Sequence, residues 1–332
     1  MRFRLDEALL FAGKLSTRKV VNYAKIRLAY LISIVFKKPV VWGYPSFLSA
    51  EPTTSCNLQC VECPTGQHQL SRPAGDMLPE TFKHLIDESS PCLLSVLLYY
   101  QGEPFLNRHL SEFIAYAHEK RVFSLLSTNG HFLSPEKCRE IIVSGLDKII
   151  ISLDGVDQET YSTYRKGGNV ETVWNGIKTL SSMKKTLGAK NPVISVQFLV
   201  MKHNENQINI AKKKALEAGA NSFVLKSLQV TTTINSGMLP ANSKYSRYSS
   251  QNGFRIKKKL LNRCLRIWQS LVVLHNGDVV SCCFDKNAEY LLGNLKQDRF
   301  VHIWKGETFT RLRLHVLKTE NQFVCVPIVP KV

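Results

Sequence analysis

Three cysteines lie within one short stretch, Cys56-Asn57-Leu58-Gln59-Cys60-Val61-Glu62-Cys63-Pro64. As thiolates they can ligate three irons of a four-iron, four-sulfur (4Fe-4S) cluster and leave the fourth iron open to another ligand. A zinc ion would usually need a fourth protein ligand, and the neighbouring sequence offers none. The spacing is much more specific than a lone pair of cysteines. The stretch is therefore a candidate iron–sulfur site, with a zinc knuckle as the alternative.

The residues that must position this site alternate between strand and helix patterns over about residues 47 to 230. Predicted strands are Phe47–Glu51, Ser95–Tyr100, Phe123–Ser127, Lys148–Leu153, Val193–Val200 and Phe223–Lys226. Predicted helices are Glu80–Glu88, Leu110–Lys120, Pro135–Ser144, Val170–Leu187 and Glu205–Ala218. This alternation predicts a parallel sheet, open or curled into a partial barrel. Ligands gather at the carboxyl ends of the strands in such folds.

Short polar motifs stand at or beyond successive strand ends. They are Gln101-Gly102-Glu103-Pro104, Ser127-Thr128-Asn129-Gly130, Ile151-Ser152-Leu153-Asp154-Gly155 and Tyr164-Arg165-Lys166-Gly167-Gly168. An Asn-Gly or Asp-Gly pair alone is more often just a turn. The order of the motifs along the chain, one strand end after another, is what makes them candidate ligand-binding segments.

The cysteine stretch and these motifs together resemble the radical S-adenosylmethionine (SAM) superfamily, whose signature is CxxxCxxC. The resemblance implies that SAM chelates the open iron of a 4Fe-4S cluster, and that the reduced cluster cleaves SAM to a 5′-deoxyadenosyl radical. The implied catalytic cluster ligands are Cys56, Cys60 and Cys63. The implied SAM-binding residues are Gln101, Gly102, Glu103, Asn129, Ser152 and Arg165.

The resemblance also gives each of these residues a role. Gly102 would let the backbone approach SAM, and Glu103 would accept a hydrogen bond from its amino group. Asn129 and Ser152 match segments near the ribose and methionyl moieties, and Arg165 matches an arginine that meets the SAM carboxylate. The chain departs from the family at Gln101, which replaces the first glycine of a GGEP motif, and at Glu62, where many relatives carry an aromatic residue.

The C-terminal cysteines resemble the opening of a SPASM/twitch auxiliary-cluster domain. Cys264 is followed after twelve residues by Gly277 and after four more by Cys282. Cys325 falls where a Cys-x-x-Cys pair is expected, but Ile328 occupies its second position. The resemblance implies a second 4Fe-4S cluster on Cys264, Cys282 and Cys325, in a domain incomplete at its C-terminus. The fourth iron would be open or bound by Cys283, and the alternative is that the cluster is absent.

A hairpin is predicted inside this domain, with strands Leu271–His275 and Val279–Cys282 around the turn Asn276-Gly277. Cys283 stands next to Cys282, and neighbouring residues on a strand point to opposite faces. We therefore expect Cys283 to turn away from Cys282 and from the cluster.

The charge balance predicts an anionic partner. The chain has 44 Lys and Arg against 26 Asp and Glu, a net charge of +18, which suits nucleic acid, an acidic peptide or membrane headgroups. Roughly the first 40 residues form a basic helical pattern, whose apolar run Leu28–Phe36 is too short to cross a bilayer. This extension either packs on the main domain or lies at a membrane interface. We expect no nucleic-acid partner, because the sequence contains no recognisable basic–aromatic binding module.

These observations predict an α/β protein, a partial (β/α)6 TIM-like radical SAM barrel with a small C-terminal α+β cluster-binding domain. The expected parts are a basic N-terminal helical extension at 1–46, the radical SAM core at 47–230, a linker with a helix at 231–263 and the SPASM/twitch-like domain at 264–332. The odd count of nine cysteines, and a start at Met1 without a signal-like apolar run, predict a reduced, cytoplasmic location, membrane-peripheral if the extension binds lipid.

The leading functional hypothesis is a radical SAM enzyme that modifies a peptide or protein. The alternatives are radical oxidation of a small metabolite, and a degenerate iron–sulfur protein that binds a partner or transfers electrons. The expected partners are a peptide or small-molecule substrate and an electron donor such as a flavodoxin or ferredoxin, with peripheral membrane contact through the N-terminal helix as a further expectation.

Overall fold

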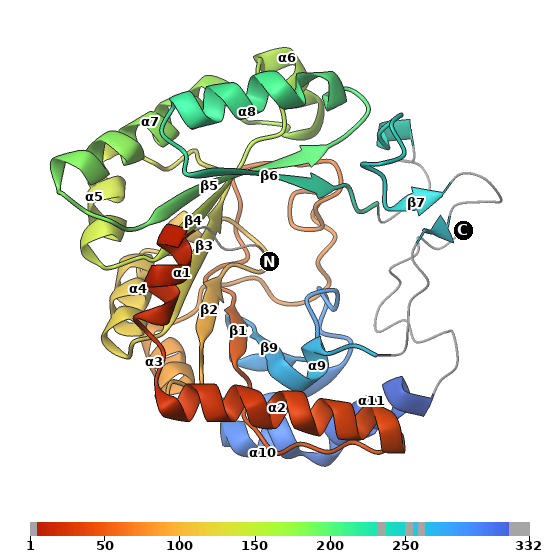
Figure 1. The fold of residues 1–332 in the computed structure, drawn as a ribbon. Coiled ribbons are helices and arrows are strands. Elements are labelled where there is room, and N and C mark those ends of the chain that lie inside the picture. Colours follow the sequence, from red (N-terminus) through yellow and green to blue (C-terminus); the bar gives the residue numbers. More distant parts are fainter. Residues whose placement is uncertain (1–4, 231–236, 250–254, 258–262, 319–332) are drawn as a thin grey trace. The chain divides into compact units, whose positions relative to one another are not determined.

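The computed structural model describes residues 5–230, 237–249, 255–257 and 263–318 (Figure 1). Cys325, Ile328 and parts of the predicted linker lie outside these ranges. The described residues form two compact units, one drawn from 5–55, 70–125 and 263–318, the other from 56–69, 126–230, 237–249 and 255–257. Neither unit is continuous in sequence. The boundaries of the four predicted parts stay a prediction.

The first unit is built on an open sheet with the strand order β11-β10-β9-β1-β2-β3. Its strands are β1 (Phe47–Ala50), β2 (Ser95–Leu98), β9 (Ser270–Val273), β10 (Asp278–Val280), β11 (Leu291–Asn294) and β3 (Phe123–Thr128), within which the two units divide. β1 pairs in parallel with both β2 and β9, so Phe47 lies opposite Ser95 on one side and Ser270 on the other. The C-terminal hairpin therefore extends the sheet that begins with β1.

The predicted hairpin is confirmed. β9 and β10 pair antiparallel, and the connecting turn ends at Gly277, whose φ of 92° is in the left-handed region that favours glycine. β10 ends at Val280, two residues earlier than predicted. Cys282 and Cys283 therefore follow the strand and do not form part of it.

The first unit also contains helices, which lie before, between and after these strands in sequence. They are α1 (Leu5–Ala12), α2 (Thr17–Phe36), α3 (Pro79–Ser89), the short η1 (Pro104–Leu106), α4 (Leu110–Glu119), α9 (Arg266–Gln269), α10 (Phe300–Lys305) and α11 (Glu307–Lys318). Ser16 caps the N-terminus of α2, and its hydroxyl accepts a hydrogen bond from the Lys19 amide. α3 and α4 pack through stacked rings of Phe82 and Phe113, with centroids 4.6 Å apart. None of the helices in the described ranges has the length and apolar character needed to cross a membrane.

The second unit contains the parallel strands β4 (Lys148–Ser152), β5 (Val193–Val200) and β6 (Ser222–Ser227), in that order. Its helices are α5 (Pro135–Val143), α6 (Gln158–Tyr164), α7 (Val170–Thr186), η2 (Glu205–Gln207) and α8 (Ile208–Glu217). Figure 1 shows α7 and α8 along one face of these strands. Within the predicted linker the described residues include the short pair β7 (Tyr248–Ser249) and β8 (Arg255–Ile256).

Local sequence explains where these helices begin. Ser134 caps α5 by accepting from the Lys137 amide, with proline at the first helical position. Asn169 caps α7 in the same way through the Thr172 amide. Both helices therefore begin after a polar side chain that accepts a hydrogen bond from a backbone amide of the first turn.

Candidate functional site

The three signature cysteines lie on one loop of the second unit. Cys60 is buried, whereas Cys56 and Cys63 are half-buried, and all three pack against one apolar cluster that includes Tyr164 and Met201. The loop is tight, because a Cβ placed on Gly66 would lie 2.8 Å from the backbone nitrogen of Cys60. The loop is therefore closely packed, and its thiols lie against apolar side chains.

A second segment holds this loop by backbone hydrogen bonds. The Gln59 amide donates to the Lys166 carbonyl at 2.9 Å, and the Val61 amide donates to the Tyr164 carbonyl at 3.2 Å. Arg165 lies between these two acceptors, at the C-terminal end of α6. Two backbone bonds therefore fix Arg165 beside the middle cysteine of the loop.

The Arg165 side chain joins a cysteine to a buried carboxylate. One terminal guanidinium nitrogen lies 3.8 Å from the Cys60 sulfur, and Nε donates to Asp154 Oδ2 at 2.6 Å. Burial lowers the pKa of the Arg165 guanidinium, but Asp154 and Cys60 raise it by more, so it ends above its ordinary value. Burial raises the pKa of the Cys60 thiol, and Arg165 opposes that rise.

Asp154 is a site residue that the sequence reasoning did not select. Its side chain is 1% exposed. One carboxylate oxygen accepts from Arg165, and the other accepts from the Leu199 amide at 2.8 Å. An Asp-Gly pair after a strand indicates only a turn, so the one available signal was its position at the carboxyl end of β4. The structure shows that this carboxylate orients the arginine.

Asn129 is connected to the cysteine loop as well. Its side-chain amide donates to Asn57 Oδ1 at 2.7 Å, and its own Oδ1 accepts from the His131 amide at 3.0 Å. His131, also missed by sequence reasoning, accepts from the Asn169 amide through Nε2. Ser152 ends β4 and is buried. The second unit thus brings Asn129 and Arg165 to the loop of the three cysteines.

The first unit holds the Gln101-Gly102-Glu103 turn. Gly102 has φ of 74°, and a Cβ there would lie 2.3 Å from the Thr53 carbonyl oxygen, so only glycine fits. The Glu103 amide donates to the Ser55 carbonyl, and its carboxylate accepts from the Phe105 amide at 3.3 Å. Gln101 and Glu103 are both buried. The contacts of the three residues with SAM stay a prediction.

A buried ionic network, which the sequence did not reveal, follows β1 in the same unit. Arg72 donates through two nitrogens to the Glu51 carboxylate, one of them to Oε2 at 2.7 Å, and its Nε donates to the Lys286 carbonyl. His275 Nδ1 lies 3.3 Å from Glu51 Oε2. The nearby Tyr100 hydroxyl is buried with no hydrogen-bond partner among the described residues. The network ties the segment at Arg72 to the C-terminal hairpin.

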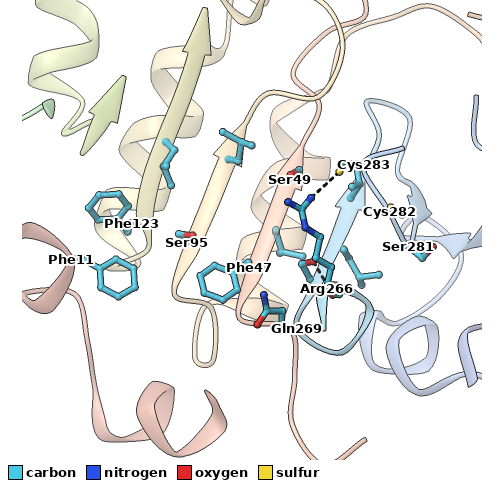
Figure 2. Close-up of a pocket in the computed structure, with 16 residues that line it drawn as sticks. Phe11, Phe47, Ser49, Ser95, Phe123, Arg266, Gln269, Ser281, Cys282 and Cys283 are labelled. Atoms are coloured by element: carbon cyan, nitrogen blue, oxygen red, sulfur yellow. Dashed lines mark hydrogen bonds between the residues drawn. The ribbon is translucent and has the colours of Figure 1, made fainter. Parts of the chain in front are cut away.

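A cavity of about 580 Å³ lies against the sheet of the first unit (Figure 2). Its lining residues, mostly apolar, are Phe11, Phe47, Leu48, Ser49, Ser95, Leu97, Phe123, Leu125, Arg266, Gln269, Ser270, Leu271, Val272, Ser281, Cys282 and Cys283. Figure 2 shows Arg266 and Cys283 on the side away from Phe11 and Phe123, with Arg266 donating to the Cys283 sulfur at 3.0 Å.

The strand on which we based the orientation of Cys283 ends before Cys282, and the expectation that Cys283 turns away from the cluster stays a prediction. Both residues line the same cavity, because they lie in a turn beyond β10 where the alternation of strand side chains does not apply. The hydrogen bond from Cys282 and the charge of Arg266 lower the pKa of the Cys283 thiol to about 6, although burial acts in the opposite direction.

The donor set on the 56–63 loop fits a 4Fe-4S cluster. Three thiols share one short loop, and a guanidinium lies beside the middle one to balance thiolate charge. In the described part of the chain no three Cys, His, Asp or Glu side chains are already arranged to hold a metal ion. Convergence of the three sulfurs on one cluster stays a prediction. Cys264 and Cys282 are described, but Cys325 lies outside the described residues, so the second ligand set also stays a prediction.

Comparison with known families agrees with these two cysteine sets. The chain matches the model of the radical SAM superfamily over residues 50–211, and that of an iron–sulfur cluster-binding domain, SPASM, over residues 264–326. The chain belongs to the radical SAM superfamily and carries a SPASM domain after its radical SAM domain. These domains imply 4Fe-4S clusters and SAM as cofactors.

Individual relatives cover the chain to different extents. An AdoMet-dependent heme synthase of Methanosarcina barkeri is 30% identical over 180 residues, which are 54% of this chain and 49% of that protein. The next two curated relatives are matched over only about a third of their length, 31% and 30%. The mycofactocin maturase MftC of Mycolicibacterium smegmatis is 26% identical over 298 residues, 81% of this chain and 72% of that protein.

A solved structure confirms the predicted fold. SuiB of Streptococcus suis, bound to precursor peptide SuiA, superposes with a TM-score of 0.63 at 12% identity, covering 86% of this chain and 70% of that one. At this identity the likeness shows the fold alone. The fold is an α/β radical SAM fold with parallel strands, as the alternation of strand and helix patterns predicted.

Proposed function

We propose that the chain is a radical SAM enzyme that abstracts hydrogen from a peptide or protein substrate in order to modify it. The observation that carries this proposal is the cysteine loop, hydrogen-bonded to the segment that places Arg165 beside Cys60. When bound, the reduced cluster supplies the electron that cleaves SAM to methionine and a 5′-deoxyadenosyl radical.

The chain's own residues would bind and orient the reactants. Cys56, Cys60 and Cys63 would ligate three irons and leave one position for SAM. Arg165 would offset the negative charge of the ligated thiolates, held in position by Asp154. Glu103, buried and already accepting one amide hydrogen bond, has acceptor capacity for the SAM ammonium group.

Four further residues belong to the proposed SAM site. The glycine at 102 allows a backbone approach that a side chain would block. Gln101 follows β2 and Ser152 ends β4, so both stand at strand ends where ligands gather. Asn129 would act near the ribose. Its side-chain nitrogen is held by Asn57, and its side-chain oxygen Oδ1 accepts from the His131 amide.

A peptide or protein substrate is supported by the mycofactocin maturase, whose match covers 81% of this chain. The alternative, radical oxidation of a small metabolite, is favoured by the heme synthase, which has the higher identity over a shorter segment. A third alternative is a degenerate iron–sulfur protein that only binds a partner or transfers electrons. The intact cysteine loop and Glu103 count against it.

The proposal extends to partners and location. A flavodoxin or ferredoxin would supply the electron, and the second 4Fe-4S cluster would be held by Cys264, Cys282 and Cys325. The protein would act in the cytoplasm, in peripheral contact with a membrane through its N-terminal helix.

Anaerobic reconstitution of the full chain with iron and sulfide tests this function. We expect the reconstituted protein, given SAM and dithionite, to form 5′-deoxyadenosine, and to form none when dithionite is left out. A reconstituted protein that holds a 4Fe-4S cluster but makes no 5′-deoxyadenosine would support the electron-transfer alternative. Precursor peptides encoded beside the gene are then tested for mass changes that depend on SAM.

A further inference from the structure

The long N-terminal helix α2 exposes apolar residues on its outward side, while the side that faces the protein is mixed. It buries the polar residues Lys19, Asn22 and Ser33 together with Ile26 and Ala29. The apolar residues it exposes are Val20 at 51%, Val21 at 46%, Leu28 at 52%, Leu31 at 54%, Val35 at 73% and Phe36 at 67%. Most of these recur at helical spacing and form a stripe opposite the buried side. A surface helix normally exposes charged and polar residues on this side.

Polar contacts fix this orientation within the first unit. Lys19 Nζ donates to the Arg121 carbonyl at 2.6 Å. Asn22 donates to the Tyr44 carbonyl at 2.9 Å and accepts from the Tyr44 amide at 2.8 Å. The buried Ser33 hydroxyl accepts from the Val40 amide at 2.9 Å. Turning the apolar stripe inward would break all of these bonds, so the folded protein displays the stripe permanently.

The charges around the stripe identify what covers it. Residues 17–38 contain six basic residues, Arg18, Lys19, Lys25, Arg27, Lys37 and Lys38, and no acidic residue. Helical geometry places Arg18 and Lys25 along one edge of the stripe and Arg27 along the other. An apolar stripe edged by Lys and Arg is typical of helices that lie in the headgroup region of a bilayer.

We propose that α2 docks the protein on an anionic lipid bilayer, lying parallel to the surface with Leu28, Leu31 and Val35 toward the acyl chains. Exposed Phe36 and Trp42 follow at the C-terminal end of the helix, and aromatic side chains are favoured at this depth. A second copy of the chain is the less suitable occupant, because two such helices would bring their basic edges together.

This inference rests on the membrane contact in the proposed function, which it makes specific, and it does not depend on the proposed radical chemistry. Vesicle binding of the reconstituted full chain is measured by sedimentation, with phosphatidylcholine vesicles and with vesicles of phosphatidylcholine and phosphatidylglycerol. We expect clear binding to the mixed vesicles and weak binding to phosphatidylcholine alone, with the difference reduced by added salt. Formation of 5′-deoxyadenosine is measured on the same preparation, so the two proposals fail separately.

Two matched pairs of variants locate the surface. Leu31→Glu/Val35→Glu should weaken binding by about a hundredfold, since each lost apolar side chain costs about tenfold. Val143→Glu/Ile210→Glu changes residues of similar exposure, 69% and 60%, on α5 and α8 and should bind like wild type. Lys25→Gln/Lys38→Gln should lose affinity for the mixed vesicles only, whereas Lys178→Gln/Lys185→Gln on α7, with the same change in charge, should not.

Three outcomes would overturn the proposal. The first is a wild-type chain that does not bind the mixed vesicles. The second is equal weakening by the α2 pair and by the α5 and α8 pair. The third is a dimer in light scattering that Leu31→Glu/Val35→Glu converts to a monomer, which would make α2 an interface between copies of the chain. Circular dichroism of each variant distinguishes a lost surface from a lost fold.

Discussion

The two cysteine regions of the molecule are supported in different ways. The loop at 56–63 takes its thiols from one short stretch, and backbone bonds to residues 164–166 hold it against an apolar cluster. The region at Cys282 and Cys283 is a turn beyond a hairpin, at the wall of a cavity, and the remaining predicted ligands come from distant parts of the chain. The first region thus takes all its thiols from one short stretch of sequence, whereas the predicted ligands of the second are spread along the chain.

The two regions also shift the pKa of a cysteine thiol in opposite directions. Burial raises the pKa of the Cys60 thiol despite the neighbouring Arg165. In the second region, Cys282 and Arg266 lower the pKa of the Cys283 thiol to about 6. An arginine lies beside a cysteine in both places, but Arg165 is also paired with a carboxylate, whereas Arg266 donates directly to the Cys283 sulfur at 3.0 Å. Burial is the largest cause of the shift at Cys60, whereas the hydrogen bond from Cys282 is the largest cause at Cys283, with Arg266 adding to it.

The largest expected effect is the loss of the first cluster. Cys60→Ala removes a thiolate that no neighbour on the loop can replace, so reductive cleavage of SAM should be abolished. The measurement is 5′-deoxyadenosine formation together with iron content after reconstitution. Cys138→Ala is the matched control, because Cys138 is buried in α5 and lies outside both cysteine sets. Product formation by Cys60→Ala would refute the assignment of the loop.

A partial loss of iron should mark the second region. Cys264→Ala should remove about four irons and spare the cluster of the first loop, if the second site holds a complete 4Fe-4S cluster. Iron and acid-labile sulfide are counted in parallel with wild type. Unchanged iron in the variant would mean that the chain binds a single cluster. Cys282 and Cys283 would then line the cavity without holding a cluster.

The sequence predicted the first region better than the second for a physical reason. A cysteine loop and a strand pattern are local, and the predicted strands agree with β1 to β6 within two residues at each end. Asp154 was not selected, because its partner Arg165 comes close only when α6 packs after β4. The predicted strand Val279–Cys282 extends past the end of β10 at Val280. Two valines after an Asn-Gly turn indicate a strand but do not indicate where it ends.

Asp154 therefore offers an intermediate test of the first region. Asp154→Asn should keep the shape of the side chain but leave the Arg165 guanidinium without its counter-charge. We expect SAM cleavage to slow by about 10- to 100-fold, the usual effect of losing a partner that orients a cluster-side group. Iron content should stay at the wild-type level. Loss of iron in Asp154→Asn would mean that the ion pair holds the loop itself, whereas an unchanged rate would show that the pair has no part in the reaction.

The smallest expected effect concerns the second region and its arginine. At pH values above about 6 the Cys283 thiol should be mainly thiolate, which reacts with iodoacetamide far faster than a thiol does. The rate of alkylation of Cys283, followed by peptide mass spectrometry on the chain before iron is added, should therefore rise with a midpoint near pH 6.

Arg266→Gln removes a cause that lowers the pKa of this thiol, so the midpoint should move to higher pH. Cys282 is mapped in the same samples, because it donates the hydrogen bond that contributes most to the lowered pKa. A midpoint that stays in place in Arg266→Gln would assign the acidity to Cys282 alone. Cys60, alkylated in the same samples, should react only at higher pH because burial raises its pKa, so that a single experiment compares the two cysteine regions directly.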